Sequence, residues 1–313
     1  MIAKRMKYDK RSFRNDIIFI LAILGIVLLI FGYELKLLNS EYMIKRITAG
    51  DIDYDTYRKY YISEEILNQA KERVAEVVKK HPVVKDNKFV NEIGYLTFSM
   101  MSSSYNMKDA SLIDEYTFYR GISRMGLNSK FLKLYKYNQA ILVDLVYFPV
   151  PKIENQSADI NYADSWSQPR TYGGNRKHEG TDLMASNNKR GFFPVVSITD
   201  GIVEKKGWLD QGGYRIGIRS VNKGYFYYAH LDSYTPELKE GDKVIAGQLL
   251  GFMGDSGYGN EGTKGKFDVH LHLGIYVNTD DGEMSVNPYY VLQILQKNRT
   301  KWQNGVTNGD LLR

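Results

Sequence analysis

The longest uninterrupted run of apolar residues lies near the beginning of the chain. Residues Ile17 to Tyr33 carry no charge, and 17 residues is the short end of the length that crosses a bilayer as a helix, roughly 17–25 residues. Basic residues dominate positions 1–16, and no small-residue cleavage motif follows at positions 34–38, so we predict a retained single-pass anchor instead of a cleaved signal peptide. The basic end is expected to stay in the cytoplasm, which places the chain from about residue 34 onward outside the cell membrane.

Residues 34–148 show a helical pattern of apolar and polar positions. Ser63 is a suitable N-cap with two glutamates after it, and the sequence through Pro82 stops that helix. Between them runs an apolar stripe formed by Ile66, Ala70, Val74, Val77 and Val78. Two further helices are predicted, over Asp109–Gly126 and over Ser129–Tyr147. The function of this region is expected to be that of a spacer, a docking platform or a regulator.

The same region is rich in tyrosine, which can stack on sugars or form an amphipathic core. At helical spacing the core is the more common arrangement for aromatic side chains, so we expect a structural role. The tyrosines concerned are Tyr54, Tyr57, Tyr60, Tyr61, Tyr116, Tyr119, Tyr135 and Tyr137. His81 directly precedes Pro82, and we expect it to mark the end of a helix.

The pattern changes at Pro149, Pro151 and Pro169, which flank a polar connector. Six glycines precede residue 151 and 22 follow it, so strands and turns replace helices. Candidate strands are Val195–Ile198, Gly201–Lys206, Tyr214–Ser220, Tyr225–His230, Gln248–Met253 and His270–Val277. A short helix is expected at Tyr289–Gln296.

The fold class predicted from these patterns is α+β in several parts, with a mainly antiparallel β domain towards the C-terminal end. The expected parts are a basic cytoplasmic tail (1–16), a transmembrane helix (17–33), a helical extracytoplasmic region (34–148), a linker (149–169), the β domain (170–299) and a loose tail (300–313).

One of the predicted strands carries two histidines on one face. In Val269-His270-Leu271-His272-Leu273 the side chains alternate, so the apolar residues face a core and the histidines face the other side. Residues two apart on a strand have Cα atoms roughly 6.6 Å apart, which lets both imidazoles reach one small site. Two other histidines lie in short motifs, His178-Glu179-Gly180-Thr181-Asp182 and Tyr227-Tyr228-Ala229-His230-Leu231.

Histidine and aspartate in this combination indicate a metal site. Three His/Asp ligands with one open position are the pattern of a catalytic zinc site, whereas structural zinc sites fill all four positions, usually with cysteine. The chain has no cysteine, which excludes a Cys-rich zinc site, disulfides and a cysteine nucleophile. Four residues of straight strand span roughly 13 Å. The chain must therefore bend between His178 and Asp182 if both bind one ion, and Gly180 is the residue best able to allow it.

The motifs His-x-Gly-Thr-Asp, Tyr-x-His-Leu and His-x-His-Leu, in this order, resemble those of the M23 peptidases, the lysostaphin- and LytM-type zinc endopeptidases that cut peptides of bacterial peptidoglycan. The resemblance covers about half of the chain, roughly residues 148–296. It implies that His178, Asp182 and His272 bind one zinc ion per chain. It also implies that His230 and His270 are catalytic without being ligands, and it leaves open which of the two takes which proton.

The function implied by the resemblance is that of a membrane-anchored endopeptidase, which hydrolyses stem peptides or cross-bridges of peptidoglycan during cell-wall remodelling. The alternative is a non-catalytic domain of the same fold that binds wall or partner proteins in an envelope complex. An envelope partner is then expected to dock on the helical region. Glu179 resembles the base of His-Glu-x-x-His zinc proteases, but the second histidine is absent, so we expect Glu179 at the surface or behind the ligands.

Charge argues against a nucleic-acid partner. The formal net charge is +6, but residues 1–16 alone carry six basic and two acidic side chains, which leaves +2 for the rest. The glycine-rich segment 254–259 lacks the lysine and helix of a phosphate-binding loop, and we expect it to line the groove instead. Aromatic side chains expected near that groove are Tyr172, Trp208, Tyr214 and Tyr258.

Overall fold

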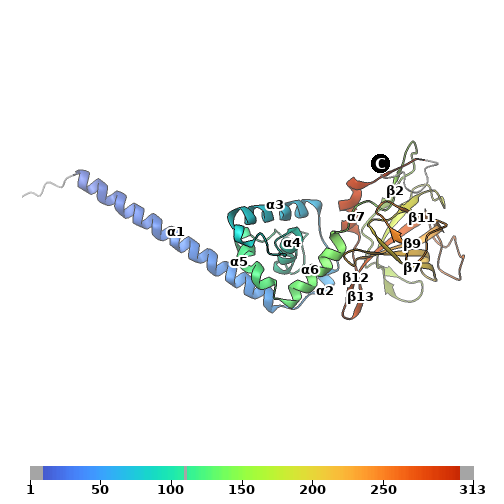
Figure 1. The fold of residues 1–313 in the computed structure, drawn as a ribbon, viewed down its shortest axis with the longest axis horizontal. Helices are drawn as coiled ribbons and strands as arrows, with labels where there is room; N and C mark the ends of the chain where they lie inside the picture. The colour runs from blue at the N-terminus through green and yellow to red at the C-terminus, as the bar shows by residue number, and fades with distance from the viewer. Residues whose placement is uncertain (1–9, 109–110, 304–313) are drawn as a thin grey trace, which may run out of the picture.

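The computed structural model describes residues 10–108 and 111–303, which form three parts along one long axis (Figure 1). A long helix projects from one end, a group of shorter helices forms the middle, and a β domain forms the other end. The order of these parts is the one predicted from the sequence, and the α+β class is confirmed.

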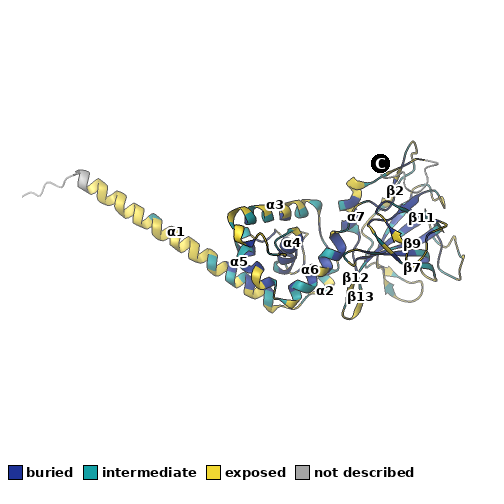
Figure 2. Ribbon diagram, viewed as in Figure 1, coloured by how far each residue is buried: buried dark blue, intermediate teal, exposed yellow. Residues whose placement is uncertain are grey.

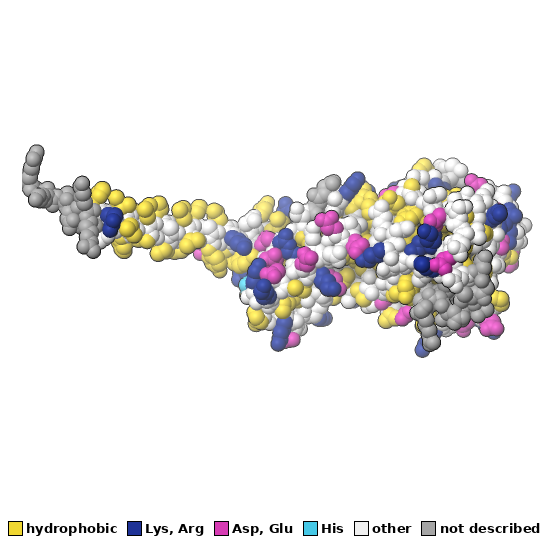
Figure 3. All heavy atoms as spheres, turned by 90° about the horizontal axis from the view of Figure 1, so that it is seen from above, with side chains coloured by type: hydrophobic (Ala, Val, Ile, Leu, Met, Phe, Trp, Pro, Cys, Tyr) yellow, Lys and Arg dark blue, Asp and Glu magenta, His cyan; other side chains and the backbone are white. Residues whose placement is uncertain are grey.

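The projecting helix α1 (Lys10–Ala49) has 40 residues and presents apolar side chains outward from Phe13 onward, with Leu29 76% exposed. Figures 2 and 3 show the projecting part of this helix exposed and hydrophobic on its surface. Within the described residues, it is the one helix long and apolar enough to cross a membrane, judged by length and composition. It continues unbroken past residue 34, and Ile44 and Ile47 near its end are buried, so the apolar segment and the helical region share one helix.

The helical region packs around a helix that sequence reasoning missed. The described helices after α1 are α2 (Tyr54–Tyr57), α3 (Glu64–Lys80), α4 (Glu92–Ser102), α5 (Glu115–Met125) and α6 (Ser129–Leu142), with a 3-10 turn at Pro82–Val84. α3 is confirmed with its caps, because Ser63 accepts a hydrogen bond from the Ile66 amide and His81 ends the helix. α4 is buried on nearly all sides, so its sequence lacks the one-sided apolar stripe that predicts a surface helix.

Two predicted helix ends were wrong. α5 begins at Glu115, where the Asp114 carboxylate accepts a hydrogen bond from the Thr117 amide at 3.0 Å; the expected cap at Asp109 lies outside the described residues. α6 stops at Leu142 and not at Tyr147. A tertiary contact accounts for the earlier end. Asp144 lies just after the helix, and its carboxylate accepts hydrogen bonds from the backbone and side-chain amides of Asn222.

The β domain is built on one long antiparallel sheet with the strand order β10-β7-β8-β9-β12-β5-β2. Its strands are β2 (Ile160–Tyr162), β5 (Thr181–Ala185), β7 (Gly201–Leu209), β8 (Gly213–Ser220), β9 (Tyr225–Tyr234), β10 (Lys243–Val244) and β12 (His270–Thr279). Three more strands attach to it, namely β6 (Pro194–Val196), β11 (Leu249–Met253) and β13 (Gly282–Val286). All six predicted strands are present, whereas β2, β5, β10 and β13 were not predicted.

The sheet has an apolar face and a polar face. On β12, Leu271, Leu273 and Ile275 are fully buried in the core, and the alternate residues His270 and His272 line a groove on the opposite face. This is the alternation predicted from the sequence. After the sheet, α7 (Tyr289–Leu295) closes the domain as expected, one residue shorter than predicted.

The expected linker and tail are both structured in part. β1 (Lys152–Ile153) pairs in parallel with β14 (Lys301–Trp302), and β2 adds an edge to the main sheet by pairing with β5. Trp302 is 8% exposed and packs edge-on against Phe252, so the tail is anchored at its start. The hairpin of β3 (Pro169–Arg170) and β4 (Arg176–Lys177) then reaches over the groove face.

Arg58 joins the helical region to the β domain. Its guanidinium donates hydrogen bonds to the Ser285 carbonyl and hydroxyl at 2.9 Å, and its own carbonyl accepts one from the Asn287 amide. The same guanidinium lies 3.6 Å from the Glu179 carboxylate, next to the ligand candidate His178. The helical region therefore contacts the β domain beside the edge of the site.

Candidate metal centre and active site

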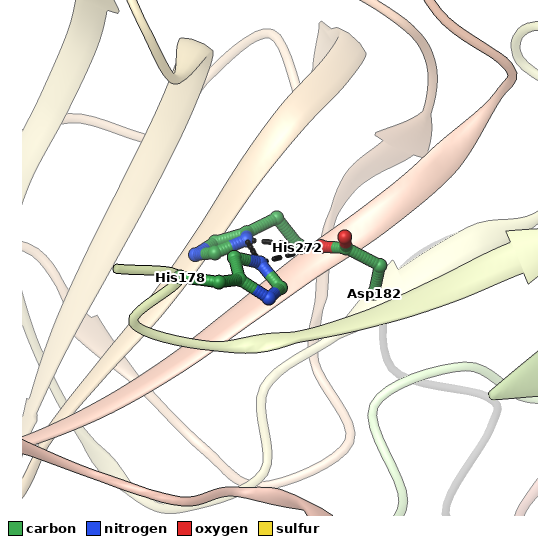
Figure 4. Close-up of side chains that lie close together, drawn as sticks. All are labelled: His178, Asp182 and His272. Atoms are coloured by element: carbon green, nitrogen blue, oxygen red, sulfur yellow. Dashed lines mark hydrogen bonds and ion pairs between the residues drawn. The ribbon is translucent and has the colours of Figure 1, made fainter. Parts of the chain in front are cut away.

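Three side chains from two neighbouring strands and the turn before them bring their donor atoms together. β5 and β12 pair with Asp182 opposite His272, and His178 lies in the turn that enters β5. His178 Nε2 lies 2.9 Å from His272 Nδ1 and 3.0 Å from Asp182 Oδ1, and His272 Nδ1 lies 3.0 Å from the same oxygen. Figure 4 shows both rings and the carboxylate converging. The structure thus unites all three residues predicted as ligands.

The protonation pattern fits a cation better than it fits a hydrogen-bond network. His178 Nδ1 is 2.9 Å from the Ser165 carbonyl, which can only accept, so the proton is on Nδ1 and Nε2 offers a lone pair. Burial lowers the pKa of His272, which favours its neutral form. Donor atoms about 3 Å apart can all lie within about 2.0–2.2 Å of a shared Zn²⁺. Two imidazole nitrogens and one carboxylate oxygen are a donor set that suits this ion.

Gly180 is needed for space rather than for a bend. A Cβ atom at this position would lie 2.5 Å from the Cε1 atom of His272 and 2.5 Å from the Leu273 carbonyl oxygen. Its φ is not among the positive values, so the left-handed freedom of glycine is not in use. The sequence singled out the right residue, and the reason is the close approach of the His272 ring.

Arg170 was missed in the sequence and directly contacts Asp182, one of the predicted ligands. Its Nη2 donates a hydrogen bond of 2.8 Å to Oδ2 of Asp182, while Oδ1 faces the two histidines. Burial works to raise the pKa of Asp182, but the neighbouring histidines outweigh it and hold that pKa well below its usual range. Arg170 lies on the short strand β3, and no motif or spacing in the sequence predicts its contact with Asp182.

His230 and His270 lie beside the three donors without joining them. Their ring centroids are 4.7 Å apart, and His270 Nε2 lies 3.7 Å from Asp182 Oδ1. Each Nδ1 faces a carbonyl oxygen, that of Ser256 at 2.8 Å for His230 and that of Asp268 at 2.7 Å for His270. Because a carbonyl oxygen can only accept, each ring holds a proton at Nδ1.

The backbone of His230 is strained at the place where its ring enters the site. Its φ is +61°, the left-handed region that non-glycine residues rarely adopt. The pairing of β8 with β9 shifts at this point, so that Ala229 and His230 on β9 stand opposite Arg215 alone on β8, which is a β-bulge. Burial, followed by the nearby His270 and His272, lowers the pKa of His230 well below its usual value, so its ring is neutral near pH 7.

An open groove of about 990 Å³ runs over these five residues. Tyr258 lines it, as predicted, and Tyr172 stacks flat on Tyr258 with ring centroids 3.9 Å apart. Trp208 and Tyr214 pack edge-on against each other beside the groove and are not among its lining residues. Glu179 lies at the groove edge with its side chain 51% exposed, which is the surface position expected for it.

Comparison with known proteins places these residues in a described family. Residues 176–288 match the family model described as peptidase family M23. A crystal structure of a Ruminococcus gnavus protein, assigned as a glycyl-glycine endopeptidase LytM, shares 39% identity with a TM-score of 0.65, and the similarity covers 83% of this chain and 98% of that one.

Two curated relatives match over part of their length. An L-Ala–D-Glu endopeptidase of Bacillus subtilis is 40% identical over 194 residues, which is 62% of this chain and 57% of the relative. The glycyl-glycine endopeptidase ALE-1 of Staphylococcus capitis is 28% identical over 146 residues, 42% of this chain and 36% of the relative. The chain thus spans little more than half the length of the first of these relatives and less of the second.

Proposed function

The chain belongs to peptidase family M23, and on that premise we propose that it is a zinc-dependent endopeptidase that hydrolyses peptide bonds of peptidoglycan, in stem peptides or cross-bridges, during cell-wall remodelling. The observation that carries the proposal is the triangle of donor atoms from His178, Asp182 and His272, with sides of 2.9–3.0 Å, beside two further histidines. A domain kept only for binding has no need of this complete set.

The three donors would hold one Zn²⁺, which when bound polarises a carbonyl group and lowers the pKa of water. Asp182 and the neutral rings of His178 and His272 leave its positive charge largely uncompensated. His230 and His270 each offer Nε2 to the groove, where the pair can take a proton from the attacking water and return one to the leaving amine. General acid–base help of this kind is typically worth about 10²–10⁴-fold in rate.

The bond we propose to test first is the one between L-Ala and D-Glu of the stem peptide. The support is the Bacillus subtilis relative, which carries that specificity in its name and is 40% identical over 194 residues. The glycyl-glycine bond named for the more distant ALE-1 relative is the competing choice.

The decisive experiment uses the full chain purified in detergent and intact peptidoglycan sacculi. Zinc-loaded protein is expected to release new amino termini, metal-depleted protein is not, and mapping of the released peptides identifies the bond. A folded, zinc-loaded protein that releases nothing from any wall type would contradict the peptidase function. His270→Ala then separates the two roles, because a scaffold that binds an envelope partner through residues 34–148 would keep its cellular phenotype with this substitution.

We further propose that α1 anchors the chain in the cell membrane, with the N-terminus in the cytoplasm and the peptidase domain outside. The support is the exposed apolar surface of α1, preceded by a basic segment. A helix rises 1.5 Å per residue, so about 20 residues of α1 match a hydrocarbon core of about 30 Å. The mass of the mature N-terminus tests retention, and cleavage of the β domain by protease added outside intact protoplasts tests the orientation.

A further inference from the structure

We propose, resting on the peptidase function above, that Arg215 binds a free carboxylate of the substrate beside the bond that is cleaved. The preferred substrate class would then be an anionic peptide whose residue next to that bond keeps an ionised carboxyl group. A glutamyl residue joined onward through its γ-carboxyl group is one such residue, because its α-carboxylate stays free on the carbon attached to the scissile nitrogen.

The position of Arg215 is set by the same bulge that places His230. Arg215 on β8 stands opposite the pair Ala229 and His230 on β9, and Ala229 pairs in turn with His272 on β12. Neighbouring strands lie about 4.8 Å apart, so the backbones of Arg215 and His272 are roughly 10 Å apart. Ala229 lies between them in the sheet, and all three residues line the groove together with His230.

That separation suits a carboxylate close to the reacting bond. An extended peptide advances about 3.5 Å per residue, and an arginine side chain spans most of what remains of the roughly 10 Å between the two backbones. The guanidinium can thus meet a group carried by the residue next to the scissile bond. The buried Tyr225 and the half-buried Tyr227 line the same groove, and burial raises the pKa of Tyr225 to about 12, so it remains a neutral donor.

Arg215 has no anionic partner of its own. Its Nη1 atom is buried without a hydrogen bond, and it forms no ion pair with any residue that the structure describes. A buried polar group without a partner costs free energy, so such a group is retained where a ligand completes it. For a guanidinium, the matching ligand is a planar oxyanion bound by two parallel N–H donors.

The carboxylates that line the groove are already engaged elsewhere. Arg170 pairs with Asp182, Arg58 with Glu179 and Arg219 with Glu283, and Asn188 donates to the Asp268 carboxylate. On β4, the half-buried Arg176 and the exposed Lys177 add two cations that lack a carboxylate partner among the described residues. The lining carries four basic and four acidic side chains, so its charges nearly balance, and Arg215 stays without a carboxylate partner among the described residues.

The test compares two peptides that differ in one charge. The first is L-Ala–D-Glu joined through its γ-carboxyl group to L-Lys, with the α-carboxylate free, and the second carries an α-carboxamide in its place. With full-length zinc-loaded protein, kcat/KM is expected to be about 10- to 100-fold higher for the carboxylate, the range of a charged hydrogen bond. Calorimetric titration of the metal-free protein should show the same order of affinities, which gives a readout independent of turnover.

Variants assign the preference to a residue. Arg215→Gln should bind and cleave the two peptides equally, Arg215→Lys should keep part of the preference, and Lys243→Gln, which removes an exposed cation on β10 away from the groove, should keep all of it. Zinc content should be unchanged in all three. Thermal unfolding of Arg215→Gln should match that of the wild type or exceed it, because the substitution removes a half-buried charge with a buried nitrogen that lacks a partner; a large loss of stability would mean a structural role.

The outcomes separate the two proposals. If the wild type cleaves both peptides equally, the carboxylate site is overturned and the peptidase function stands. If neither peptide nor any wall preparation is cleaved but the carboxylate peptide still binds better through Arg215, the site stands and the peptidase function is overturned. If Arg215→Gln does not fold, the comparison of the two peptides on the wild type and on Arg215→Lys still decides.

Discussion

Two buried polar clusters, one in the helical region and one in the β domain, are built in opposite ways. In the helical region the fully buried Asn138 accepts hydrogen bonds from the hydroxyls of Tyr57 and Tyr60 at 3.0 Å and donates one to Thr97 at 2.9 Å. The Thr97 hydroxyl in turn donates a hydrogen bond to the Ile93 carbonyl. Each donor in this series of hydrogen bonds has an acceptor inside the protein.

The cluster in the β domain is not closed in this way. His178 Nε2, His272 Nδ1 and Asp182 Oδ1 face one another at 2.9–3.0 Å, and an adjacent guanidinium, that of Arg215, has a buried nitrogen without a partner. Leaving a buried polar group unsatisfied costs about 1–3 kcal/mol. The comparison separates a polar network that is closed within the protein from one that, on our proposals, a cation and a substrate complete.

The strongest way to break the comparison is to remove a metal ligand. His272→Ala is expected to lose zinc and all measurable turnover, because two donors cannot replace three in a catalytic site. Chelation of the wild type should have the same effect and be reversed by zinc. Metal analysis together with release of wall peptides checks this, and retained zinc in His272→Ala would show that the donor triangle is not the metal centre. Zinc should also raise the melting temperature of the wild type and not that of the variant.

The next largest effect concerns a histidine that is not a ligand. His270→Ala should keep its zinc, since His270 Nε2 lies outside the donor triangle, 3.7 Å from Asp182 Oδ1. Its turnover should fall by about 10²–10⁴-fold, the usual contribution of general acid–base catalysis. Single-turnover rates on a wall peptide, combined with zinc content, make the measurement. Loss of zinc in this variant would instead place His270 among the ligands.

Substitution in the Asn138 cluster of the helical region should lower the stability of the protein without changing catalysis. Asn138→Ala removes the acceptor shared by Tyr57 and Tyr60 and leaves two buried hydroxyls unsatisfied, so the free energy of unfolding should fall by roughly 2–5 kcal/mol. Zinc affinity and the kcat of the folded fraction should be unchanged. Chemical denaturation and zinc titration check this, with Tyr57→Phe as a milder control that removes one donor. A lower zinc affinity would show that the two clusters are coupled.

Sequence reasoning succeeded where the decisive pattern is local. The alternation around His270 and His272 fixes which face of β12 carries the site, because a slip of one residue would bury both histidines in the core. The order of the motifs was enough to predict Asp182 as a ligand, and the structure brings it together with His178 and His272, although β5 itself was missed: it is short and begins with polar residues. The same locality explains why the caps of α3 were predicted correctly.

It failed where the role of a residue depends on distant parts of the chain. Arg170 reaches Asp182 from a two-residue strand, and Arg215 owes its position to a bulge in the neighbouring strand. Neither feature leaves a periodic signal. Segment 149–169 was expected as a linker because it is polar and contains prolines, yet Ile160–Tyr162 pairs with β5 in the main sheet. Three residues of strand are too few to be recognised without their partner.

The smallest effect that we predict sharpens the role of Arg170. Arg170→Met keeps the aliphatic stem but frees Oδ2 of Asp182, so the carboxylate is no longer held with Oδ1 towards the histidines. Loss of such an orienting partner usually weakens metal binding by about 10- to 100-fold. Zinc titration against a competing chelator measures it. Arg176→Met on the paired strand β4 is the matched control, because Arg176 makes no contact with a ligand and should leave the affinity unchanged. If Arg170→Met binds zinc as tightly as the wild type while its KM for wall peptides rises, Arg170 acts on the substrate. The residues that determine zinc affinity would then be the two histidines and the aspartate alone.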